Sequence, residues 1–128
     1  MRSLLRGVVV LALLLTGCEP EPASDRQRSR FESAYRAAQE LVRAHEGTDV
    51  AFAPIPATVM VDQTGEGRWT MTAGPVRIDF HDSRATVRAP CTIGQEQATF
   101  TARLREKDGE HRPADDDTVG SLEVTRNP

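Results

Sequence analysis

The sequence predicts a small α+β domain, with one N-terminal amphipathic helix packed on one face of a four- to five-stranded antiparallel meander. Two patterns predict this fold class. Apolar residues recur at the helical period over residues 30–45, and from residue 59 onward they alternate with polar residues. The chain has 128 residues, which is room for one small domain and excludes large enzymes, multidomain receptors and polytopic membrane proteins.

The helix over residues 30–45 is indicated by seven side chains that share one helical stripe. They are Phe31, Ala34, Tyr35, Ala38, Leu41, Val42 and His45. Ser29 is followed three residues later by Glu32, which has the form of a capping box and predicts the start of the helix. Ser24 with Gln27 offers a weaker, earlier start, and Gly47 predicts the end. We expect the stripe to face the core.

The strands are indicated by rows of alternating apolar residues, which are typical of antiparallel sheets with one face in water. The rows are Val59 and Val61; Trp69, Met71 and Ala73; Val76, Ile78 and Phe80; Ala85, Val87, Ala89, Cys91 and Ile93; and Ala98, Phe100, Ala102 and Leu104. The parity changes at Gly74-Pro75, which predicts a bulge or a break. A last short strand is expected at Leu122 and Val124, after a loop over residues 106–119. A helix followed by a meander resembles cystatin-like folds at the level of topology.

The first 17 residues have the organisation of a secretory signal peptide. Arg2 and Arg6 give the first six residues a positive charge. Residues 7–15 are almost entirely apolar, and small residues follow. The apolar run is shorter than the ~20 residues that a membrane-spanning helix needs, so we expect it to be removed rather than kept as an anchor.

The residues Leu15-Thr16-Gly17-Cys18 resemble the lipobox of bacterial lipoproteins. The resemblance implies cleavage between Gly17 and Cys18, a diacylglyceryl thioether on Cys18, and an N-acyl chain such as palmitate on its amine. Two or more acyl chains anchor a protein stably in a bilayer. Glu19 in place of Asp implies an outer-membrane location facing the periplasm, or the outer face of the cell membrane if the source has a single membrane. The alternative is an ordinary cleaved signal with an unrelated cysteine.

These features predict three parts: a signal peptide over 1–17, lipidated Cys18 with a flexible tether up to residue 29, and a single small domain over 30–128. Without residues 1–17, which contribute two arginines, 14 basic side chains face 19 acidic ones, and the net charge is −5. Export and this acidic charge argue against a nucleic-acid partner.

The polar face of the predicted sheet is the main candidate for binding. Its arginines and threonines are Arg77, Arg88, Arg103, Arg105, Thr86, Thr99 and Thr101. Such side chains could bind a polyanion, a glycan or the carboxylates of an envelope protein. The alternative is that threonine suits strands and arginine keeps a water-exposed face soluble.

Candidates for catalysis are few. Cys91 is the only cysteine besides Cys18, and a thiol enzyme would combine it with His81 or His111. The shared parity of Cys91 with Val87 favours a buried, inert thiol. Neither histidine has metal-ligand spacing, and three aspartates at 115–117 do not continue into a calcium-binding loop, so we expect no metal or other cofactor. The sequence therefore favours a non-catalytic binding or interaction module of the cell envelope, with a small thiol enzyme as the alternative.

Overall fold

The computed structural model describes residues 19–114 and 121–127. Cys18, Gly17 and the three aspartates at 115–117 lie outside these residues. In this part of the chain, one helix, α2 (Asp25–Glu46), accompanies a single antiparallel sheet. Its strands are β1 (Glu21–Pro22), β2 (Val50–Phe52), β3 (Met60–Gly65), β4 (Arg68–Ala73), β5 (Val76–His81), β6 (Arg84–Ile93), β7 (Glu96–Lys107), β8 (Glu110–Pro113) and β9 (Leu122–Arg126).

The prediction of a four- to five-stranded meander of cystatin-like topology is wrong, because the sheet has nine strands. Its main path runs β1-β3-β4-β5-β6-β7-β8, while β2 pairs with β6 and β9 pairs with β7. β6 and β7 are 10 and 12 residues long, so each can hold two short partners along one of its edges. β1, β2 and β8 come from segments too short or too irregular to show alternation in the sequence. β8 in particular lies within the stretch that we expected to be a loop.

Tight turns set the register of the central strands. Ala73 lies opposite Val76, His81 opposite Arg84, and Ile93 opposite Glu96, so two residues form each turn. Their first residues have positive φ, as Gly74 (56°) and Asp82 (54°) do, and this suits two-residue hairpins. The parity change at Gly74-Pro75 is therefore the predicted break, a hairpin turn between β4 and β5, and not a bulge.

The helix begins earlier than the preferred capping box suggested. Ser24 is its N-cap: the Ser24 side chain accepts from the Gln27 backbone, and the Gln27 side chain accepts from the Ser24 backbone. Arginines in the first turns of a helix are repelled by the positive end of its dipole. This repulsion is reduced here because Arg28 Nε lies 3.0 Å from Glu32 Oε1. β1 precedes the helix, with Glu21 opposite Val61. Residues 21–29 therefore belong to the folded part, which corrects the tether expected over residues 18–29.

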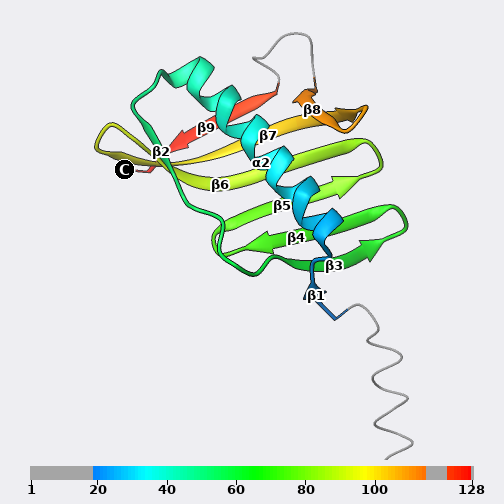
Figure 1. The fold of residues 1–128 in the computed structure, drawn as a ribbon. Helices are drawn as coiled ribbons and strands as arrows, with labels where there is room; N and C mark the ends of the chain where they lie inside the picture. The colour runs from blue at the N-terminus through cyan, green and yellow to red at the C-terminus, as the bar shows by residue number, and fades with distance from the viewer. Residues whose placement is uncertain (1–18, 115–120, 128) are drawn as a thin grey trace, which may run out of the picture.

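Figure 1 shows α2 running diagonally across one face of the sheet. Helix residues such as Phe31 and Val42 are fully buried there, together with sheet residues such as Ile78, Val87 and Phe100. These residues form one hydrophobic cluster, in which the inward-facing residues of every central strand take part. The opposite face of the sheet is left without a covering element among the described residues. It carries the polar residues that alternate with the buried ones along each central strand.

Candidate functional site

The uncovered face of the sheet, here called the open face, carries all seven predicted arginines and threonines. The register places Arg77 opposite Arg88, Arg88 opposite Thr101, and Thr86 opposite Arg103. Thr99 lies opposite Thr125 of β9. The four arginines Arg77, Arg88, Arg103 and Arg105 are exposed, and the three threonines are partly buried. Pairing between strands therefore brings the predicted residues onto one continuous surface.

Carboxylates are interspersed in the middle of the open face. Asp79 accepts a hydrogen bond from the Thr70 hydroxyl at 2.7 Å, and Arg77 Nε lies 3.3 Å from its other oxygen. Glu123 lies 3.8 Å from Arg103. Both ion pairs are exposed, so water screens them and they contribute little to stability.

A row of basic residues crosses one end of the open face. Register pairs join Arg68 to His81, His81 to Arg84, Arg84 to Arg105, and Arg105 to Arg112. We call these five residues the basic row. All five are exposed, and each comes from a different strand, from β4 to β8. Of the five, Arg105 belongs to the predicted binding face, and His81 shares the polar side of its strand with Arg77. Parity along the strands predicts that Arg68 lies on the same face as Thr70, and Arg84 on the same face as Thr86. Only the pairing register between strands shows that the five residues form one row.

The basic row opposes like charges directly. Arg84 lies between His81 and Arg105, and neither Arg84 nor Arg68 forms an ion pair with a carboxylate among the described residues. Like charges directly opposite each other on neighbouring strands destabilise a sheet. Local arrangements that oppose stability concentrate at functional sites. The basic row is therefore the strongest candidate for a binding site.

A second polar cluster lies on the helix side of the sheet, between α2 and β8. The Ser33 hydroxyl is hydrogen-bonded to His111 Nδ1 at 3.0 Å. His111 Nε2 lies 3.0 Å from Glu106 Oε2, without the alignment of a hydrogen bond. Glu106 also binds Arg30 Nε at 2.9 Å, and the Arg30 guanidinium lies 4.3 Å from the Phe80 ring centroid.

The environment of His111 favours the neutral imidazole. Its side chain is 1% exposed. Burial lowers the pKa of His111, while the Glu106 carboxylate partly opposes this effect and Arg30 reinforces it. The order Ser33, His111, Glu106 is that of a serine, base and acid. However, Ser33 lies inside α2, where backbone N–H groups bond within the helix and cannot form an oxyanion hole. The geometry fits a structural role, in which these polar contacts hold β7 and β8 against α2.

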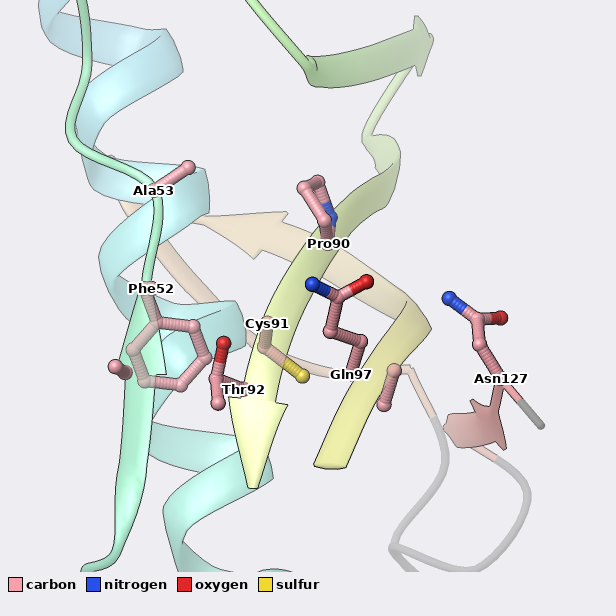
Figure 2. A pocket seen from close by; sticks show the side chains of 9 residues that line it. Phe52, Ala53, Pro90, Cys91, Thr92, Gln97 and Asn127 are labelled. Carbon is pink, nitrogen blue, oxygen red and sulfur yellow. The ribbon is translucent and has the colours of Figure 1, made fainter. Parts of the chain in front are cut away.

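Cys91 lies in a different part of the molecule. Figure 2 shows its side chain between Phe52 and Gln97, in a groove of about 380 Å³. The cysteine is 5% exposed. Burial and the Glu46 carboxylate raise the pKa of the thiol, although Arg126 opposes this, so the reactive thiolate is disfavoured.

The structure does not bring Cys91 to either histidine. Cys91 lies opposite Ala98 on β7, whereas His111 lies opposite Glu106 on the same strand. Eight residues of extended chain separate those positions, which is about 27 Å. His81 lies opposite Arg84, seven residues before Cys91 on β6 and therefore about 24 Å away. Cys91 therefore forms no pair with His81 or His111.

Within residues 19–114 and 121–127, no group of three or more histidine, cysteine or acidic side chains is arranged to hold a metal ion. Within the same residues, no helix has the length and apolar character required to cross a bilayer. The chain matches no family model, no curated protein and no solved structure.

Proposed function

We propose that the protein is a lipid-anchored, non-catalytic binding module of the bacterial cell envelope, and that its open face binds an anionic partner. The anchor would be the diacylglyceryl and N-acyl chains on Cys18. In a cell with two membranes the domain would face the periplasm from the outer membrane. In a cell with one membrane it would lie on the outer face.

The anchor is supported by the sequence at the end of the apolar segment. Leu15, Thr16 and Gly17 precede Cys18 in the order of a lipobox, and the apolar run before them is too short to span a bilayer. A protein with this signal needs its cysteine lipids to stay at the membrane after cleavage.

The binding role is supported by one observation above all: the basic row places cations directly opposite one another on neighbouring strands. An anion bound over Arg84, which forms no ion pair with a described carboxylate, would offset its repulsion with Arg105. Arginine also presents a planar set of donors that matches carboxylate, sulfate and phosphate groups. The enzyme alternative has less support, because the Cys91 thiol is buried and far from both histidines.

Binding of a sulfated polysaccharide tests the proposal. Intact protein extracted from membranes in neutral detergent is applied to immobilised dextran sulfate at physiological salt. We expect retention, elution by higher salt because screening weakens charge contacts, and loss of retention in Arg84→Gln/Arg112→Gln.

The matched control is Arg26→Gln/Arg36→Gln, which removes the same charge from exposed positions of α2. This control should be retained like the unmodified protein. Absence of retention in the unmodified protein, or equal loss in both double variants, would reject binding through the open face.

A further inference from the structure

The basic row has the dimensions of a linear binding site. Its five side chains come from five consecutive strands, β4, β5, β6, β7 and β8, which lie side by side in Figure 1. Neighbouring strands are ~4.8 Å apart, so the row presents one basic side chain per strand over about 19 Å. The row runs across the strands rather than along one of them. A ligand that engaged all five residues would have to be extended and repeat its charge at a similar interval.

The adjacent row of the open face has a different chemistry. Thr70, Asp79 and Thr86 lie opposite one another, two residues farther along their strands and therefore about 7 Å from the basic row. Hydroxyls donate and accept hydrogen bonds, and a carboxylate accepts them. Such groups suit the hydroxyls of a sugar. The Asp79 carboxylate would repel any anionic polymer at this distance, and the repulsion grows with the charge density of the polymer. A chain with one charge on each sugar is therefore repelled less than a phosphate chain.

Among the described residues, two carboxylates lie within ion-pair distance of His81 and Arg112, and Arg105 also has an interaction partner. His81 Nε2 is 3.5 Å from Asp82 Oδ2, and Arg112 is 3.1 Å from Glu110. All four side chains are at least half exposed, so these pairs are weak and a ligand can compete with them. Arg68 and Arg84, in contrast, have no described carboxylate within ion-pair distance.

We propose that the basic row binds a linear acidic polysaccharide, with one carboxylate on each sugar residue and the chain lying across strands β4 to β8. Successive carboxylates would bind successive strands, and sugar hydroxyls would bind the row of Thr70, Asp79 and Thr86. This inference rests on the proposed function and names the class of its anionic partner.

Oligogalacturonates of two to eight residues test the inference, because each residue carries one carboxylate. Binding to intact protein in neutral detergent is measured by calorimetry at 0.15 M salt. We expect affinity to rise with each added residue up to five and then to level off, because the basic row spans five strands. Methyl-esterified oligomers, which lack the charge, should bind at least tenfold more weakly than the acids, since hydrogen bonds to charged groups are the stronger ones.

The decisive variants are Arg84→Glu and Arg88→Glu. Both lie on the open face of β6 and both change the charge by the same amount. Arg88 is about 13 Å farther along the strand, beyond the screening length of ~8 Å at this salt concentration. We expect Arg84→Glu to weaken binding of the six-residue oligomer by about tenfold or more, and Arg88→Glu to change it by less than about threefold.

Equal weakening by the two variants, or affinity independent of oligomer length, would overturn the linear arrangement. Binding to dextran sulfate or to anionic vesicles without binding to oligogalacturonates would overturn the acidic polysaccharide and leave the proposed function standing. Failure to bind any polyanion would overturn both.

Discussion

On the open face, Arg84 of β6 lies directly opposite Arg105 of β7. On the other neighbouring strand, β5, His81 lies opposite Arg84. A sheet gains stability when opposite charges face each other in such pairs, and loses it when like charges do. Removing a positive charge from the basic row should therefore raise the free energy of unfolding and lower the affinity for an anion.

Replacing Arg84 with glutamate should stabilise the fold while it weakens anion binding. The change converts the like-charge pair of Arg84 and Arg105 into an opposite-charge pair, and we expect the free energy of unfolding to rise by about 0.5 kcal/mol. Urea denaturation at low salt measures it, and the gain should shrink at 1 M salt. Arg88→Glu is the comparison, because the arginine opposite Arg88, Arg77, already forms an ion pair with Asp79. A destabilised Arg84→Glu variant would contradict the repulsion.

Stability should fall in mild acid because of His111. Burial lowers the pKa of this imidazole in the folded state, so between that value and the usual ~6.5 the unfolded chain binds more protons. The contribution of His111 is present above pH 6.5 and is lost as the pH falls through the folded-state pKa. Urea denaturation from pH 5 to pH 8 should give a smaller slope for His111→Asn than for the unmodified protein. Equal slopes for the two proteins would argue against the buried neutral imidazole.

Cys91 should react slowly in the folded protein. Its thiol is buried, and its raised pKa keeps it protonated at neutral pH. We expect alkylation by iodoacetamide at pH 7.5 to be at least ~100-fold slower in the native protein than in urea, because the thiolate is the reactive form. Mass spectrometry follows the reaction. Rapid alkylation of the native protein would instead support the alternative that the protein is a thiol enzyme.

Changing Cys18 to serine should abolish lipidation. The unmodified protein should partition with membranes, and its mature N-terminus should carry acyl chains by mass spectrometry. Cys18→Ser should keep residues 1–17 or be released from the membrane. A soluble, unacylated chain recovered from cells with the natural sequence would remove the anchor from the proposal.

The two candidate capping serines should differ in their effect on stability. Ser24 caps α2 through Gln27, so Ser24→Ala should lower the free energy of unfolding by about 1 kcal/mol. Ser29 lies within the helix and is exposed, so Ser29→Ala should be neutral or slightly stabilising. Thermal denaturation of both variants checks this, and the reverse order would place the start of the helix at residue 30.

Side-chain alternation was sufficient to predict which residues of the long strands are buried, because one face of each strand must enter the core. Ile78, Val87 and Phe100 lie there as expected. Alternation could not reveal β1 or β2, whose two or three residues are too few to show a period. The early helix start was also hidden, because the dipole disfavours arginines in the first turns. The compensating contacts are Arg28 with Glu32 and Arg30 with Glu106, and the second joins residues 76 positions apart.

The open face was predicted in the same way, from parity, but the basic row was not. Parity states which face a side chain occupies, whereas a row depends on which residues oppose each other. That register is set by the two-residue turns and by the order of strands. Arg112 could not have been placed at all, because it belongs to β8, which the sequence indicated as a loop.

The position of β1 limits how far this protein can reach. Glu21 is already paired with Val61, so only two residues separate the ordered sheet from Cys18. A fully extended chain covers at most ~3.6 Å per residue, so Cys18 lies within about 11 Å of the first strand. If Cys18 carries the proposed lipids, the domain would be held close to the bilayer surface. A polymer bound to the domain would then lie near the lipid headgroups.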